Sequence, residues 1–131
     1  MSDYTHVNFM DDIEDSASSR MPDGSIQARF ARSHIDSEHL GVSHFTLAAG
    51  YRPPFGHRHR EQEEVYVVIA GGGRFRLEDE VREVKQWDVL RVAPRLARGF
   101  EAGPDGMELI VVGNDRPEGG DGEMLPEFWG D

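Results

Sequence analysis

The stretch that decides the fold is HRHREQEEVYVVIAG, which runs from His57 to Gly71. It reads as the end of one strand, a polar turn and a second strand, because residues 65–69 are β-branched or aromatic. Side chains at positions i and i+2 of a strand share a face, so His57 and His59 point the same way. If the second strand pairs back across the turn, Glu64 comes to lie beside both histidines.

Two imidazoles and one carboxylate that converge from a rigid sheet form a facial ligand set for a divalent first-row metal. The pattern therefore predicts that His57, His59 and Glu64 bind such a metal, with iron, manganese, nickel and zinc all chemically suitable. The alternative is a solvated turn of histidine, arginine and glutamate without any ligand role. His44, on an expected strand just upstream, is interpreted as a histidine satisfied within the sheet rather than as a further ligand.

The spacing His-x-His-x4-Glu-x6-Gly resembles the first motif of the cupin superfamily. In this resemblance His57, His59 and Glu64 take the three metal-ligand positions, and Gly71 takes the closing glycine. Gly50 lies near the opening glycine, one residue further upstream than the usual pattern. The resemblance implies a small single-domain cupin, an all-β jelly roll or double-stranded β-helix barrel.

The rest of the sequence agrees with an all-β fold. Short runs with alternating polarity, separated by glycine and proline turns, indicate an antiparallel sandwich or barrel. We expect strands over residues 25–32, 40–47, 65–69, 74–77, 81–84, 89–92, 98–102 and 107–112. Residues 71–73 and 103–106 are predicted to be turns. The chain divides into an acidic N-terminal arm (1–24), the cupin barrel (25–113) and a C-terminal loop and tail (114–131).

The second motif of the cupins is only partly present. Asp88 and Pro94 match it, whereas Trp87 and Arg95 stand where the motif has glycines. Arg98 stands where the motif has its metal-binding histidine. Arginine stays protonated and has no lone pair to give to a metal, so the fourth ligand is missing.

Three placements of Arg98 are open at this point. In the first, His57, His59 and Glu64 hold the metal alone, and Arg98 lies nearby to pair with a carboxylate or phosphate of a substrate. In the second, Arg98 replaces the charge of the metal, pairs with Glu64 or Glu63, and the pocket is metal-free. In the third, Arg98 points outward.

Other side chains are candidates for substrate binding. Tyr66 shares a strand face with the glutamate of the ligand set, and Phe100 shares a face with Arg98. Arg91 lies on the approach and offers a further partner for a carboxylate. Glu63 is a candidate for proton transfer, as is the ligand glutamate. The alternative for Tyr66 and Phe100 is a place in the aromatic core.

Composition narrows the functional classes. The 131 residues fit one domain and include no cysteine, which excludes disulfides and thiolate metal sites. The net charge of −11 argues against nucleic acid as a partner and gives no support to binding an anionic membrane. No apolar run reaches the length of a membrane span, and the N-terminus lacks the pattern of a signal peptide. We therefore expect a cytoplasmic protein.

Two functions fit these observations. One is a metal-dependent enzyme that acts on a small polar or anionic substrate, and the other is a non-catalytic domain that binds a small molecule. Phe128 and Trp129 make the C-terminal tail unusually apolar, so it either folds back across the barrel or packs on a partner subunit. Together with the N-terminal arm, the tail is a candidate surface for a homodimer.

Overall fold

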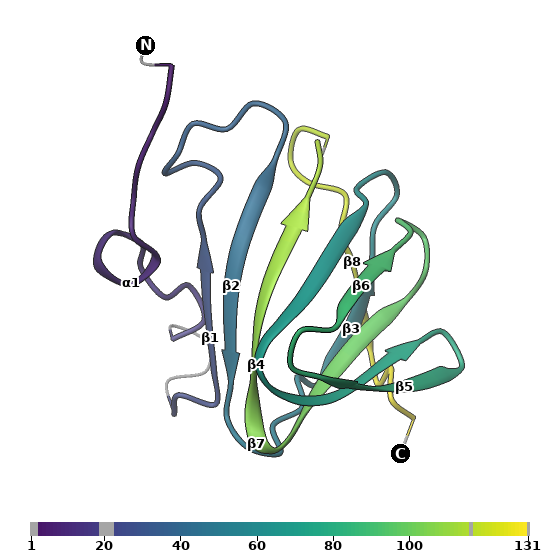
Figure 1. The fold of residues 1–131 in the computed structure, drawn as a ribbon. Helices are drawn as coiled ribbons and strands as arrows, with labels where there is room; N and C mark the ends of the chain where they lie inside the picture. Colours follow the sequence, from purple (N-terminus) through teal and green to yellow (C-terminus); the bar gives the residue numbers. More distant parts are fainter. Residues whose placement is uncertain (1–2, 19–22, 116, 131) are drawn as a thin grey trace.

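The computed structural model describes residues 3–18, 23–115 and 117–130. The predicted all-β class is confirmed, because a single short helix accompanies the strands in the described ranges (Figure 1). The elements in chain order are α1 (Phe9–Asp12), β1 (Ile26–Phe30), β2 (Gly41–Leu47), β3 (Phe55–Arg58), β4 (Glu64–Leu77), β5 (Glu80–Lys85), β6 (Val89–Val92), β7 (Arg98–Gly113) and β8 (Glu123–Pro126). No helix in the part of the chain that the structure describes is long and apolar enough to span a membrane.

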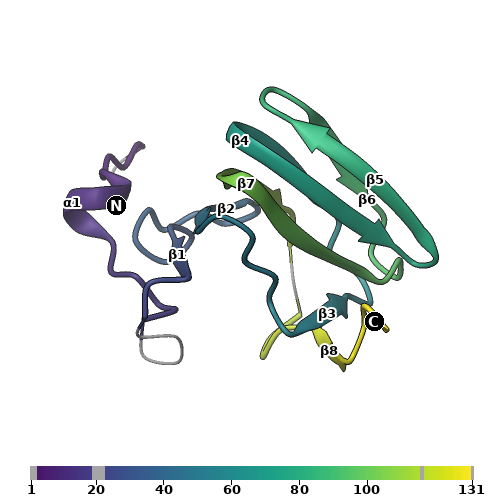
Figure 2. The same cartoon turned by 90° about the horizontal axis from the view of Figure 1, so that it is seen from below.

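One antiparallel pair, β4 with β7, organises the sheet. Its register runs from Glu64 opposite Gly113 to Leu77 opposite Arg98. On the outer side of this pair, β2 pairs with β7, and β1 pairs with β2. β5 and β6 pair with β4, whereas β3 pairs with β7 and β8. The sheet curls, so that β5 and β6 lie on one side of β7 and β3 and β8 on the other (Figure 2).

Residues 71–73 and 103–106 do not form the predicted turns. Both segments lie inside long strands, β4 and β7, whose pairing is interrupted by register shifts of the kind that β-bulges produce. Gly71 has φ +66, and a Cβ atom there would lie 2.1 Å from the carbonyl oxygen of Gly106. The glycines therefore let the two strands bend and approach each other closely, instead of ending them.

The core lies on the inner face of the curl and is built around three aromatic rings. Tyr66 and Phe75 have ring centroids 5.1 Å apart, and Phe75 and Phe100 have centroids 5.4 Å apart. Tyr66 and Phe75 belong to the same strand, so their contact requires β4 to curl strongly. The buried core consists of Leu47, Tyr66, Val68, Phe75, Val92, Phe100, Ala102, Met107, Leu109 and Val111.

The C-terminal tail folds back onto the sheet, which is the first of the two outcomes predicted for Phe128 and Trp129. β8 pairs with β3, and a Cβ atom added to Gly56 would lie 2.5 Å from the Phe128 ring. The guanidinium carbon of Arg52 lies 4.2 Å from the Trp129 ring centroid, and that of Arg76 lies 4.9 Å from the Phe128 centroid. These contacts fix the tail beside β3.

Replacing Gly71 with alanine should lower the free energy of unfolding by about 3 kcal/mol, because the new Cβ meets backbone and the positive φ disfavours an L residue. Gly50→Ala is the matched control, since Gly50 has φ +71 but nothing within 4 Å of its Cβ position. We expect a loss of roughly 1 kcal/mol there. Urea unfolding measures both, and equal losses would contradict the close approach of β4 and β7 at Gly71.

Candidate metal centre

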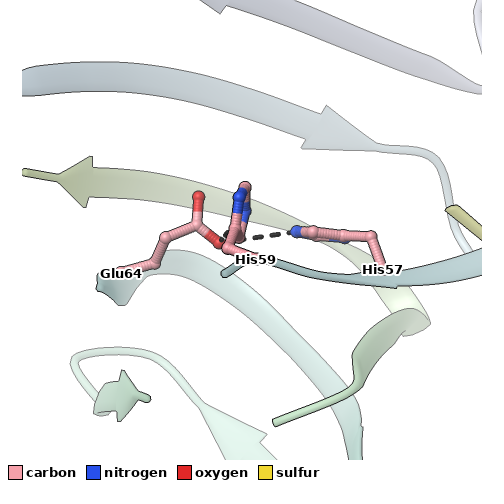
Figure 3. A group of neighbouring side chains, drawn as sticks. All are labelled: His57, His59 and Glu64. Atoms are coloured by element: carbon pink, nitrogen blue, oxygen red, sulfur yellow. Dashed lines mark hydrogen bonds and ion pairs between the residues drawn. The ribbon is translucent and has the colours of Figure 1, made fainter. Parts of the chain in front are cut away.

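The side chains of His57, His59 and Glu64 converge on one point, and we call them the ligand triad (Figure 3). Their potential ligand atoms all lie within 4.8 Å of one another. His57 Nε2 is 3.4 Å and His59 Nε2 is 3.3 Å from the same oxygen, Glu64 Oε1. The structure thus brings together the three residues that the spacing predicts.

Local backbone structure explains this convergence. His57 lies in β3 and faces Arg98 of β7 across the pair, whereas Glu64 begins β4 on the face that it shares with Tyr66. His59 lies in the connection between the two strands, and its backbone N–H donates to the carbonyl oxygen of Pro94 at 2.8 Å. The ligand triad therefore comes from two strands and a tethered connection.

Glu64 is ionised in this setting. Its side chain is 14% exposed, and burial alone would raise the pKa of its carboxyl group. The Tyr66 hydroxyl and the imidazoles of His57 and His59 lie against the carboxylate, reverse this effect and hold the pKa far below its ordinary value. The Tyr66 hydroxyl donates a short hydrogen bond to Oε1, at 2.7 Å.

Arg98 is fully buried and points into the site, so the alternative in which it points outward is excluded. Its Nη1 and Nη2 groups donate to the carbonyl oxygens of Pro94 and Ala93 at 3.0 and 3.2 Å. Its Nε lies 3.8 Å from Glu64 Oε1 and makes no hydrogen bond within the described residues. Arg98 is thus a fixed positive charge beside the ligand carboxylate.

The sequence analysis missed one residue of this site, Asp121. Its side chain is 1% exposed, and its Oδ1 lies 2.8 Å from Nδ1 of His59. Burial would raise the pKa of Asp121, but hydrogen bonds from backbone N–H groups and from His59 lower it far below the usual range. The surrounding residues are glycines and acids, a composition typical of an exposed loop, and so no local signal marked it.

Other candidate residues lie apart from the ligand triad. Arg91 Nη1 is 3.1 Å from Glu63 Oε2, and these side chains are 65% and 48% exposed. The predicted roles of Arg91 in substrate binding and of Glu63 in proton transfer stay predictions. The exposure of both side chains does not support them. Phe100 packs in the aromatic core beside Tyr66. His44 lies in β2, with Nε2 2.9 Å from a carboxylate oxygen of Glu108, but its buried Nδ1 makes no hydrogen bond among the described residues.

Two open hollows on the surface also lie away from the ligand triad. One is lined by loop residues 32, 37–38, 115 and 117–120, and the other lies over the glycine-rich bend of β4 and β7. Both linings mix acidic and basic side chains with glycines, and neither contains a histidine. The ligand triad is therefore the stronger candidate for a functional site.

The ligand triad fits a divalent first-row metal. Donor atoms that each lie about 2.1 Å from one ion are separated by roughly 3 to 3.4 Å. The two histidine-to-Glu64 distances fall at the upper end of this range. In addition, Nε2 of His59 is buried and makes no hydrogen bond among the described residues, which leaves a nitrogen directed at the centre of the group.

Comparison with known proteins identifies the fold. No family model matches the chain, and no curated protein matches its sequence. Among solved structures, a cupin protein from Bacteroides fragilis aligns with a TM-score of 0.71 and 23% identity, over 88% of this chain and 86% of that chain. The chain has the cupin fold. The predicted jelly-roll class is therefore confirmed.

Two further cupin-like neighbours are enzymes. The polyketide cyclase RemF from Streptomyces resistomycificus aligns with a TM-score of 0.72 and 20% identity, over 95% of this chain and 85% of that chain. Oxalate decarboxylase from Bacillus subtilis aligns with a TM-score of 0.74 and 22% identity, over 92% of this chain and 33% of that longer chain. At these identities the likeness is one of fold.

The low pKa of Glu64 predicts a pH-dependent contribution to stability. A carboxyl whose pKa is lowered by folding stabilises the protein above its unfolded pKa of about 4.3, and this contribution is lost as the pH falls. The difference in unfolding free energy between the unmodified protein and Glu64→Gln should therefore shrink between about pH 5 and pH 2. Urea unfolding in the presence of a chelator measures it. A difference that stays constant over this range would contradict the ionised, hydrogen-bonded Glu64.

Proposed function

We propose that this cupin-fold chain binds one divalent first-row metal through His57, His59 and Glu64 and uses the centre to hold a small anionic ligand. The convergence of the three side chains, with the buried and unpaired Nε2 of His59 among them, carries the proposal. Iron, manganese, nickel and zinc all suit two imidazoles and one carboxylate. When bound, such an ion polarises an oxygen of the ligand as a Lewis acid.

The charges around the triad support an anionic ligand. The ionised carboxylate of Glu64 is already accompanied by the buried guanidinium of Arg98, with Nε 3.8 Å from Oε1. A divalent cation then adds positive charge that the protein groups at this point do not fully neutralise. An excess of buried positive charge is relieved by an anion, such as a carboxylate or an enolate oxygen.

Each protein group has a separate part in this centre. His57 and His59 offer nitrogen lone pairs, and Tyr66 holds Oε1 of Glu64 through its hydroxyl hydrogen bond. Arg98 commits two of its donors to backbone carbonyls, so it keeps a constant position and does not swing as a free clamp. Its contribution to an anionic ligand is chiefly its charge.

Metal content tests the proposal. Protein incubated with excess Zn²⁺ or Co²⁺ and then desalted should retain about one ion per chain by elemental analysis, because three converging donors form a specific site. His57→Ala, His59→Ala and Glu64→Gln should each lose most of it. His39→Ala is the control, since His39 lies on the surface with a side chain that is 75% exposed. Retention well below one ion, unaffected by the triad variants, would overturn the proposal.

A second candidate function is a metal-free centre in which Arg98 replaces the charge of the metal. The close approach of Arg98 to Glu64 favours it, because the carboxylate already has a buried cation beside it. In that case the chain binds its small-molecule ligand through Arg98 and the histidines. This candidate predicts no specific uptake of metal.

Arg98→His separates the two candidates. For a metal centre, this change removes a positive charge and adds a nitrogen donor, so Zn²⁺ affinity should rise by about tenfold or more, which corresponds to about 1.4 kcal/mol. Arg91→His is the matched control, because Arg91 is exposed and lies apart from the triad. Isothermal titration measures both. Unchanged or weaker binding in Arg98→His, with the fold intact, would favour the metal-free candidate.

A further inference from the structure

The C-terminal segment reaches back to the ligand triad through one residue, Asp121. Besides its Oδ1 contact with Nδ1 of His59, Asp121 accepts three backbone hydrogen bonds at Oδ2. The donors are the N–H groups of Arg60, Glu61 and Gln62, at 3.0, 2.6 and 3.0 Å. A single buried carboxylate thus holds both the His59 ring and the connection that leads from it to Glu64.

The position of Asp121 is itself fixed by strand pairing. β8 begins two residues later and runs antiparallel to β3, with Glu123 opposite Arg58 and Met124 opposite His57. The ion pair of Arg58 and Glu123, with Nε 2.9 Å from Oε2, is exposed to solvent and adds little to this pairing. The C-terminal segment therefore follows the histidine-bearing strand and delivers Asp121 to the inner side of the connection.

We propose that Asp121 is a positioning residue that keeps the proton of His59 on Nδ1, so that the Nε2 lone pair faces His57 and Glu64. Its consequence for metal binding rests on the proposed function. Its effect on the His59 ring does not depend on that function.

The argument follows from the chemistry of the two groups. A neutral imidazole carries one N–H and one lone pair, and an ionised carboxylate only accepts hydrogen bonds. Both ring nitrogens of His59 face a carboxylate, but Nδ1 lies 2.8 Å from Asp121 Oδ1, whereas Nε2 lies 3.3 Å from Glu64 Oε1 and makes no hydrogen bond among the described residues. The single N–H of the neutral ring is therefore assigned to Nδ1, which leaves Nε2 as the acceptor. A carboxylate behind a ligating histidine also orients the ring and increases its basicity, and loss of such a partner typically weakens metal binding 10–100-fold.

Asp121→Asn tests this assignment with little change in shape. If the amide oxygen keeps the three backbone N–H donors, the amide NH₂ faces Nδ1 of His59 and turns this nitrogen into an acceptor. The proton then moves to Nε2, the atom needed by the metal, as in the wrong-tautomer effect of an aspartate-to-asparagine change behind a catalytic histidine. Asp121→Ala removes the constraint without imposing the opposite tautomer. Glu123→Gln is the matched control, an acid in the same segment whose side chain is 56% exposed.

The primary measurement is ¹⁵N NMR of the histidine rings in metal-free protein, recorded above the end of the His59 titration. We expect the Nδ1–H tautomer for His59 in the unmodified protein and in Glu123→Gln, and the Nε2–H tautomer in Asp121→Asn. Zn²⁺ affinity should fall 10–100-fold in Asp121→Asn and Asp121→Ala and stay unchanged in Glu123→Gln. Thermal unfolding verifies that the variants are folded.

The outcomes separate this inference from the proposed function. An Nε2–H tautomer of His59 in the unmodified protein would by itself overturn the positioning role. An unchanged tautomer in folded Asp121→Asn would also overturn it. Unmodified protein that takes up no metal but shows the expected tautomers would overturn the metal proposal alone. A merely structural role for Asp121 predicts lower thermal stability without any shift of the His59 proton.

Discussion

The curl of the β4–β7 pair is the constraint on which the site depends. A straight strand of the length of β4, 14 residues, would extend roughly 45 Å at about 3.3 Å per residue. Glu64 begins β4, and Arg98 pairs with Leu77 at the opposite end of the same strand. Nevertheless, Arg98 Nε lies 3.8 Å from Glu64 Oε1. Only a strand pair that bends back on itself brings these two charges together, and the glycine-lined bulges make that bend possible.

The same curl determines the electrostatic character of the centre. A half-buried carboxylate needs compensation, and Glu64 receives it from the Tyr66 hydroxyl, two imidazoles and the Arg98 guanidinium. The arginine has no lone pair to donate, so this position supplies a charge and not a metal ligand. A metal that binds here therefore meets three donors and a neighbouring cation. On the proposed function, this arrangement would lower the affinity for the metal and increase the attraction for an anion.

Much of the ligand triad could be predicted because its pattern is local. Alternation along a strand places His57 and His59 on one face, and the short spacing to Glu64 allows the next strand to bring it alongside. The all-β class follows equally from short alternating runs. These inferences need only the geometry of neighbouring residues, and they do not depend on how the whole sheet closes.

The features that could not be predicted depend on contacts between distant segments. A run of glycines is typical of a turn and of a bulge alike, so residues 71–73 were predicted to end a strand that in fact continues to Leu77. Whether the glycines form a turn or a bulge depends on the strand that pairs with them, and the sequence of β4 alone does not identify that strand. The direction of Arg98 posed the same difficulty, since it depends on the pairing of β7 with β3 and β4, which brings Arg98 Nε within 3.8 Å of Glu64 Oε1.

The C-terminal segment shows why a ligand motif alone does not define a centre. The motif supplies donor atoms, but imidazole has two nitrogens, and which one carries the lone pair depends on what the other one meets. For His59 the other nitrogen meets Asp121, more than sixty positions later in the chain. That carboxylate precedes β8, which pairs with β3, and Phe128 of the same segment packs over Gly56. On the proposed role of Asp121, the C-terminal segment is thus the part of the fold that orients His59, and its loss would alter the centre while leaving every residue of the motif in place.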